Sequence, residues 1–361
     1  MYSLGIDIGY SSVKVMLTDE KDTIQFSRYQ LHKGHAKKVL SGILNELLQS
    51  YQPQEIEYGA VTGNGSRFLC ADGAVSPVND VTAVIEGALA ENREIGSIID
   101  IGGESARFIT GLGGEKSRIK ILMNSNCSSG TGAFLEEQMS RLNLELTDYS
   151  ELIKKAKTIP RIAGRCSVFA KTDITHHQQE GVPAPDILLG LAYAFARNYK
   201  GTVMKKSPVA KPVLFSGGVA HNEGIITAFR DILELGDGDL VFPSHLGCVG
   251  VLGAAVIAHK ERLPVHLDGI LSAIEHAEDK RTNGEDEIVF PGLSAYGSGD
   301  GIGKHVCKKL SIEDGVTDCY LGVDIGSTST NLVLIDTSGE IVCYKYLRSE
   351  ERRVGKECFV P

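Results

Sequence analysis

Two glycine-rich turns constrain this chain more than any other feature, because each follows an apolar strand and carries an aspartate. The first turn, within residues 4–14, holds Asp7, and the second, within residues 98–105, holds Asp100. Glycines in such a turn let backbone N–H groups approach a phosphate closely. A carboxylate repels phosphate, so its natural partner beside one is a hydrated Mg²⁺ ion. Two such turns therefore predict a clamp for a polyphosphate.

A third strand followed by glycines occupies residues 212–222 and suits contact with the base and ribose of a nucleotide. One aspartate–glycine turn alone is also typical of an ordinary hairpin, so the prediction depends on the three units together. In this order they resemble the phosphate 1, phosphate 2 and adenosine motifs of the acetate and sugar kinase, Hsp70 and actin superfamily. That resemblance implies an α/β fold in which two ribonuclease-H-like lobes enclose a central ATP cleft. It implies catalytic roles for Asp7, Asp100 and Lys14, and nucleotide contacts from Gly9, Ser11, Ser12, Gly102, Gly103, Glu104, Gly130, Gly132, Glu136, Gly217, Gly218 and Asn222.

Length and composition agree with this expectation. At 361 residues the chain is long enough for two lobes, because single cores stop growing at about 250–300 residues. Its net charge of −9, with no dense Lys/Arg run before the last residues, argues against a nucleic-acid partner. The N-terminus enters a strand directly and no apolar run approaches membrane length, so we expect no membrane association and a cytoplasmic location.

Apolar periodicity predicts the elements around the turns. Alternation over residues 13–26 predicts a hairpin after the first turn, and helical spacing over residues 39–48 predicts an amphipathic helix. Asp80 is expected to cap a helix over residues 81–91, which leads into the second turn. A long helix is expected over residues 186–205.

Two of the eight cysteines stand where small residues give way to a helix. They are Cys127 and Cys166, and Arg165 precedes the second. A helix N-terminus and a neighbouring cation both lower the pKa of a thiol, and thiolate is the form that binds metal. The spacing alone favours two unrelated helix-start cysteines, because metal motifs normally need closer pairs. If the two do bind a cluster, a second copy must supply the other two thiolates, which predicts a symmetric dimer with the metal on its axis.

Four stretches together resemble the activators of 2-hydroxyacyl-CoA dehydratases, which are grouped with the ATPase subunits of benzoyl-CoA reductase. They are residues 100–103, 123–132, 166–170 and 217–222, and the resemblance covers residues 1–262. It implies a homodimer with one ATP site per chain and one [4Fe–4S] cluster per dimer, bridged by Cys127 and Cys166 of both chains. It also implies ATP-driven delivery of a low-potential electron to a separate dehydratase or reductase component.

Three positions depart from the pattern of that family. Tyr10 stands where serine is usual, Glu104 where glutamine is common, and Asn64 where an aromatic residue is frequent. A carboxylate near the γ-phosphate would repel it or add a water contact. We therefore expect Glu104 to change the rate of ATP hydrolysis more than the affinity for ATP. The change at Asn64 bears on partner docking.

Two other classes of function compete with the activator. A small-molecule kinase would use the same ATP cleft and would tolerate loss of Cys127 and Cys166. A metal-free chaperone or regulator gated by nucleotide would bind ATP and hold no iron.

The sequence predicts four segments. Residues 1–263 form the two-lobed ATPase unit, and residues 264–319 form a helix and a flexible linker. Residues 320–347 begin a truncated second unit, because the opening motif returns there at an offset of 317, with Asn331 in the place of Lys14. Such a repeat resembles the long activator fusions that carry two ATPase units before dehydratase-like domains. Residues 348–361 are interpreted as an artefact, because residues 348–358 back-translate into a widely used sequencing adapter.

Overall fold

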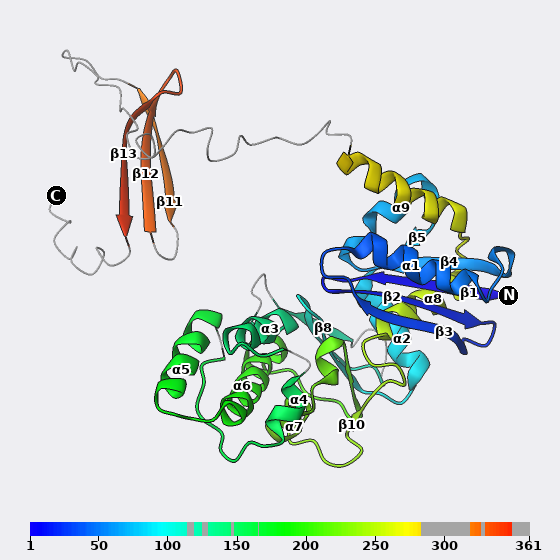
Figure 1. Cartoon of the computed structure of the whole chain (residues 1–361), viewed down its shortest axis with the longest axis horizontal. Coiled ribbons are helices and arrows are strands. Elements are labelled where there is room, and N and C mark those ends of the chain that lie inside the picture. The colour runs from blue at the N-terminus through cyan, green and yellow to red at the C-terminus, as the bar shows by residue number, and fades with distance from the viewer. Residues whose placement is uncertain are drawn as a thin grey trace. The chain divides into compact units, whose positions relative to one another are not determined.

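The computed structural model describes residues 1–113, 119–124, 129–145, 148–164, 166–282, 318–325 and 329–348. The chain divides into two compact units, Met1–Gly284 and Glu285–Pro361. In Figure 1 the described elements of the first unit run from blue to yellow, and those of the second are orange to red. The expected linker falls mostly on residues 283–317, which lie outside the described residues.

The first lobe is built on a five-stranded sheet in the order β3-β2-β1-β4-β5. The first three strands form an antiparallel meander, and the last two run parallel to β1. The predicted hairpin and amphipathic helix are both confirmed. The elements are β1 (Tyr2–Ile8), β2 (Ser12–Asp19), β3 (Ile24–Leu31), α1 (Ala36–Leu48), η1 (Pro53–Glu55), β4 (Ile56–Thr62), η2 (Asn64–Gly73), β5 (Ser76–Pro77) and α9 (Leu267–Thr282).

The second lobe repeats this topology in the order β10-β9-β6-β7-β8, again a meander with parallel strands added to its first strand. Helices α3, α5, α6 and α7 share a core with one face of its sheet. The elements are β6 (Ser97–Ile101), β7 (Ala106–Thr110), β8 (Lys120–Met123), α3 (Gly132–Arg141), α4 (Tyr149–Ile153), α5 (Ser167–Gln179), α6 (Ala184–Tyr199), η5 (Lys200–Met204), β9 (Val213–Ser216), η6 (Gly218–His221), α7 (Glu223–Leu233) and β10 (Leu240–Val241).

Strand alternation explains how each sheet of the first unit gains two covered faces. On β1, Leu4 and Ile6 face a core that includes α1, whereas Gly5 faces α8 (Val249–Glu261). A Cβ on Gly5 would lie 2.2 Å from the carbonyl oxygen of Val251, so the sheet and α8 approach closely only because this residue is glycine.

Helix α8 and helix α2 (Asp80–Glu91) pack against each other and connect the two lobes. A Cβ on Gly253 would lie 1.7 Å from the carbonyl oxygen of Ala83, and one on Gly87 would lie 2.0 Å from that of Val249. The two helix backbones are therefore in direct contact. This is the predicted α/β architecture of two ribonuclease-H-like lobes.

Two expectations differ from the structure in detail. The cap of α2 is Asn79, whose side chain accepts the amides of Val81 and Thr82, so the prediction of Asp80 as the cap was wrong. Asp80 is the first residue of the helix instead. The long helix expected over residues 186–205 is regular only to Tyr199 and continues as the single π-turn η5. None of the described helices is both long and apolar enough to cross a membrane.

The second unit holds a three-stranded antiparallel sheet of β11 (Cys319–Ile325), β12 (Ser329–Asp336) and β13 (Ile341–Arg348). Its register repeats that of β1–β3: Leu321 pairs with Leu334 as Leu4 pairs with Leu17. The hairpin turn repeats too, because Asp336 accepts two backbone amides of its turn as Asp19 does. Residues 349–361 lie outside the described residues.

Candidate functional site

A pocket of about 360 Å³ lies between the two lobes of the first unit, and both glycine turns line it. Its wall also includes the turn that follows β9. The structure thus brings together most of the residues selected from the sequence. They are Asp7, Gly9, Ser11, Ser12, Lys14, Asp100, Gly102, Gly103, Glu104, Gly217 and Gly218.

The two turns face each other across this pocket. A Cβ on Gly103 would lie 3.0 Å from the ring of Tyr10 and 3.4 Å from the hydroxyl of Ser11, so the second turn touches the first. Both turns close in the same way, through a backbone bond from Gly9 to Ser12 of 2.9 Å and one from Gly102 to Ser105 of 2.8 Å.

Lys14 supplies the cation of the first turn. It faces Asp7 across the β1–β2 pair, and its Nζ donates to the Asp7 carboxylate at 2.7 Å. Burial alone would lower the pKa of Lys14, but the Asp7 carboxylate outweighs burial, so this pKa is raised above its ordinary value. The ammonium group therefore stays charged. It also lies 5.8 Å from the centre of the Tyr29 ring, which is another pocket residue.

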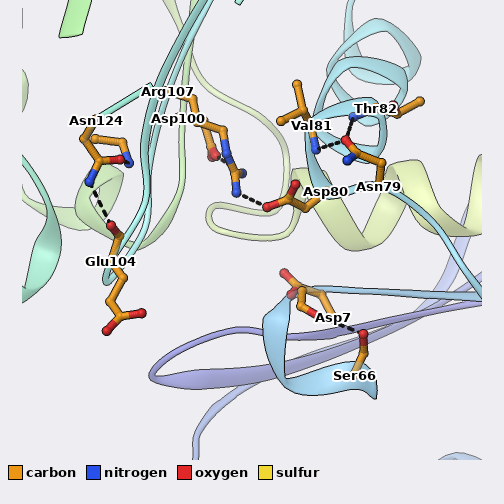
Figure 2. A network of polar contacts seen from close by, with 12 residues as sticks. Asp7, Ser66, Asn79, Asp80, Val81, Thr82, Asp100, Glu104, Arg107 and Asn124 are labelled. Atoms are coloured by element: carbon orange, nitrogen blue, oxygen red, sulfur yellow. Dashed lines mark hydrogen bonds and ion pairs between the residues drawn. The ribbon is translucent and has the colours of Figure 1, made fainter. Parts of the chain in front are cut away.

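Arg107 supplies the cation of the second turn. Its Nη1 donates to Asp100 at 2.9 Å and its Nη2 pairs with Asp80. Figure 2 shows the guanidinium reaching from Asp100 toward Asp80, next to the helix cap Asn79. The second oxygen of Asp100 accepts the hydroxyl of Ser216 at 2.8 Å. Both carboxylate oxygens of Asp100 therefore accept a hydrogen bond.

Arg107 and Asp80 are pocket residues that the sequence argument missed. A signal for Arg107 was present, because the second lobe repeats the first: Asp100 faces Arg107 across β6–β7 as Asp7 faces Lys14 across β1–β2, both at a spacing of seven residues. The other pocket residues that were not selected as site residues are Tyr10, Tyr29, Thr62, Gly63, Asn64, Gly65, Val84, Ser105, Ser216, Gly247 and Gly250.

The charges of the pocket favour a metal-bound polyphosphate over a bare one. Four carboxylates line it, from Asp7, Asp80, Asp100 and Glu104, against the two cations of Lys14 and Arg107. A polyanion entering this surplus of negative charge is repelled unless a divalent cation accompanies it. Asp7 and Asp100 have oxygens of the kind that Mg²⁺ prefers, so the donor set fits such an ion.

Four of the residues expected to contact the nucleotide do not line the pocket. Asn222 caps α7 by accepting the amide of Ile225 at 3.1 Å, and Glu136 is exposed on α3. Gly130 has a φ of +86°, and Gly132 begins α3.

Helix α3 begins directly on the second turn. The backbone N–H groups of Gly132 and Ala133 donate to the carbonyl oxygens of Gly102 and Gly103, each at 2.8 Å. The first N–H groups of a helix have no partner within it, so these bonds fix the start of α3 to the pocket wall. From the other side of the turn, the Asn124 amide donates to the backbone carbonyl of Glu104 at 3.1 Å (Figure 2).

Of the two selected cysteines, only Cys166 is described, and Cys127 lies outside the described residues. Cys166 is the N-cap of α5 and is partly exposed. Beside it, Val168 and Phe169 are 63% and 65% exposed, which is unusual for large apolar side chains. Within the described part of the chain, no three His, Cys, Asp or Glu side chains gather into a metal site.

A buried hydrogen-bonded network connects the segments next to the two cysteines. Ser129 donates its hydroxyl to the carbonyl of Gly164 at 3.0 Å, and Asn198 of α6 donates its amide to Ser129 at 2.6 Å. Ser129 follows Cys127 by two positions and Gly164 precedes Cys166 by two. The network therefore ties Ser129 and Gly164, each two positions from a cysteine in the sequence, to one helix.

Comparisons with known proteins agree with this fold. Residues 4–258 match the BadF/BadG/BcrA/BcrD ATPase family. The activator of lactoyl-CoA dehydratase from Anaerotignum propionicum is 30% identical over 265 residues, which are 72% of this chain and 98% of the relative. Component A of the Acidaminococcus fermentans (R)-2-hydroxyglutaryl-CoA dehydratase has a similar structure, with a TM-score of 0.66, 25% identity, and coverage of 72% and 98%. The Clostridium difficile activator of 2-hydroxyisocaproyl-CoA dehydratase, with bound ADPNP, gives a TM-score of 0.63 at 24% identity, with coverage of 78% and 98%.

Proposed function

The chain belongs to the BadF/BadG/BcrA/BcrD ATPase family, and from this premise we propose that it is an ATP-dependent activator of a 2-hydroxyacyl-CoA dehydratase or a related acyl-CoA reductase. It binds ATP, passes one low-potential electron to that partner, and couples this transfer to hydrolysis. Relatives whose names describe activators of such enzymes support this function.

ATP with Mg²⁺ occupies the pocket between the lobes. Asp7 and Asp100 hold the water ligands of the metal ion, and Lys14 contacts the phosphates. The glycine turns offer backbone N–H groups, with Ser11 and Ser12 adding hydroxyls on one side. Gly217 and Gly218 lie against the nucleoside.

Cys127 and Cys166 hold the iron–sulfur cluster. Each chain offers two thiolates and a [4Fe–4S] cluster needs four, so the donor set fits only across two copies. Cys166 suits this role, since it is partly exposed and lies at the positive end of α5. The exposed Val168 and Phe169 next to it give a second copy an apolar surface to cover. When bound, the cluster stores and releases the single electron.

One observation above all supports the coupling of nucleotide to cluster. The bonds from Gly132 and Ala133 to the carbonyls of the second turn join the pocket wall to α3, the helix that follows Cys127 in the sequence. ATP and ADP differ at the γ-phosphate, which the two turns contact. A ligand shifts a conformational equilibrium by as much as its affinities for the two states differ, so a turn that binds ATP and ADP differently also biases α3.

Residues 320–347 belong, on this proposal, to a second unit of the same fold. The repeated register of β11–β13 supports this assignment. Asn331 donates to Asp324 at 3.1 Å where Lys14 donates to Asp7, so this repeat keeps the strand pairing next to the first turn without the cation of Lys14.

Anaerobic purification of the full chain, followed by iron, sulfide, mass and ATPase measurements, tests the proposal. We expect about four irons and four sulfides for every two chains, and ATP hydrolysis in their presence. Cys166→Ala or Cys127→Ala should remove the iron and leave ATP binding intact. An iron-free monomer that phosphorylates a small metabolite, with or without the two cysteines, would show a kinase instead.

A further inference from the structure

Arg107 has an unusual position for a side chain that is not part of the sequence motifs. It lines the nucleotide pocket, yet its side chain is only 9% exposed, and it forms ion pairs with two carboxylates from different elements. Asp100 comes from the second turn, and Asp80 is the first residue of α2. The guanidinium is thus shared between the phosphate-binding turn and the helix that connects the lobes.

The surroundings of Arg107 leave it little freedom to move. The Tyr199 hydroxyl donates to its backbone carbonyl at 2.5 Å, and neighbouring strands hold it on both sides. Its Nε is buried without a hydrogen-bond partner among the described residues. A buried donor left unpaired is costly, so a planar cation at this position must be favoured mainly by its bonds to Asp100 and Asp80.

The Asp80 carboxylate is available for an ion pair with Arg107 because it does not cap helix α2. Asn79 accepts the first amides of α2, and the Asp80 carboxylate pairs with the Arg107 guanidinium instead. Figure 2 shows the two side chains meeting above Asp7, which lies on the other lobe. Asp80, Arg107 and Asp100 therefore form a row along one wall of the pocket.

We propose that Arg107 is a positioning residue for the metal ion of the bound nucleotide. By its bond to Asp100 it fixes the orientation in which that carboxylate meets the hydrated Mg²⁺, and by its bond to Asp80 it makes the orientation depend on α2. This inference rests on the proposed function, because it requires Mg²⁺ and a nucleotide in the pocket. It goes beyond the glycine motifs, which contain neither Arg107 nor Asp80.

Arg107 could act through its positive charge alone or by orienting the Asp100 carboxylate. These two explanations predict different results for three variants. Arg107→Met removes one positive charge beside two carboxylates, and Asp80→Asn removes one negative charge. The double variant restores the net charge of the wild type but leaves Asp100 without its partner. Arg28→Met is the control, because it removes the exposed Arg28–Glu46 ion pair away from the pocket.

The experiment measures binding of Mn²⁺ alone, binding of ATP with Mg²⁺, and the kcat and KM of hydrolysis, with a melting curve for each variant. For Arg107→Met we expect about tenfold tighter Mn²⁺ binding, about tenfold weaker ATP binding and a lower kcat. In the double variant Mn²⁺ affinity and KM should return to within about threefold of the wild type while kcat stays at least tenfold low. Arg28→Met should match the wild type throughout.

The outcomes are distinguishable. Recovery of kcat in the double variant would show that Arg107 acts only through its charge and would overturn the inference. Unchanged Mn²⁺ affinity and kcat in Arg107→Met would overturn it as well. If Arg107→Met does not fold, Arg107→Lys keeps the test open, since a lysine retains the charge but reaches only one carboxylate, and it should lower kcat with Mn²⁺ affinity unchanged. A wild-type protein that binds no ATP would contradict the proposed function itself.

Discussion

The carbonyl oxygen of Gly102 accepts the first backbone N–H of helix α3, from Gly132, at 2.8 Å. Gly102 belongs to the turn that lines the nucleotide pocket, and α3 follows the segment that carries Cys127. A hydrogen bond between them joins the pocket wall directly to the start of α3. We therefore expect a movement of the turn to reach the helix without an intervening side chain.

Gly132→Ala tests this contact. A Cβ at position 132 would lie 3.0 Å from the carbonyl oxygen of Gly102, so the turn and the start of α3 must separate by a few tenths of an ångström. Disturbing one such bond costs about 0.5–1.5 kcal/mol, which is about two- to tenfold in ATP affinity. Titration with ATP and Mg²⁺ measures the affinity.

The matched control is Gly42→Ala in α1, where a Cβ meets nothing within 4 Å. Alanine in a helix is favoured over glycine by about 0.5–1 kcal/mol, so this variant should unfold at higher urea concentration with unchanged ATP affinity. If Gly132→Ala behaves in the same way as Gly42→Ala, the contact does not couple the turn to the helix.

Lys14→Asn gives the first turn the residue that the second unit carries at the same place. Asn331 bonds Asp324 at 3.1 Å in an undistorted strand pair, so an asparagine at position 14 should preserve the β1–β2 hairpin. A contact to a charged group contributes about 1.5–3 kcal/mol, so ATP affinity should fall about tenfold to a hundredfold.

Lys21→Asn is the control for the charge change, because Lys21 is exposed in the turn after β2, outside the pocket. It should bind ATP as the wild type does. If a calorimetric titration gives both variants the same affinity for ATP, Lys14 does not contact the phosphates.

Asn198→Ala should loosen the two cysteine-bearing segments at once. The variant loses the donor that holds Ser129, and Ser129 in turn bonds Gly164. We expect lower iron content after anaerobic purification, or a changed EPR spectrum of the iron that remains, together with a loss of about 1 kcal/mol in the free energy of unfolding.

Tyr149→Phe is a control of similar energy, because it removes a buried hydrogen bond from Tyr149 to the carbonyl of Leu188 on the same helix α6. It should lower stability to a similar extent and leave the iron content unchanged. Equal iron loss in both variants would mean that Asn198 acts through overall stability alone.

Cys248 should resist alkylation in the native protein. Its side chain is buried, and burial raises the pKa of its thiol to about 11. At pH 8 about one molecule in a thousand then carries the thiolate, and this fraction rises tenfold for each unit of pH. Mass spectrometry after iodoacetamide treatment should find Cys248 labelled in urea but not in buffer.

The raised pKa of the Cys248 thiol also predicts how the stability of the fold depends on pH. The unfolded thiol ionises at lower pH than the folded one, so between about pH 9 and 11 the unfolded state binds fewer protons and the protein loses stability as pH rises. Ready labelling of Cys248 in buffer at pH 8 would contradict both its burial and its raised pKa.

The fold could be predicted from the sequence because the local alternation of residues matches the way the strands pack in the core. Leu4 and Ile6 alternate with Gly5 on β1, and both the hydrophobic face and the helix-contacting face of that strand follow from this alternation. The phosphate-binding turns were predicted from three strand–glycine units taken together, because one such unit alone is also typical of an ordinary hairpin.

The wall of the pocket opposite Asp7 was harder to predict. Asp80 was expected to cap α2, since aspartate and asparagine serve equally well as caps and adjacent residues compete for the position. Its pairing with Arg107 joins residues 27 positions apart, and no local pattern encodes such a contact. The internal duplication of the two lobes was the one signal that pointed to Arg107.

The most direct test of the account is the EPR spectrum of the anaerobically purified, dithionite-reduced protein, recorded with saturating ADP and again with saturating ADPNP. If the second turn, α3 and the cysteine-bearing segments move together, the g values of the reduced cluster should differ between the two nucleotides. They should become alike in Gly132→Ala. Identical spectra with both nucleotides bound, or a preparation without iron, would contradict the claim that nucleotide occupancy controls the environment of a shared cluster.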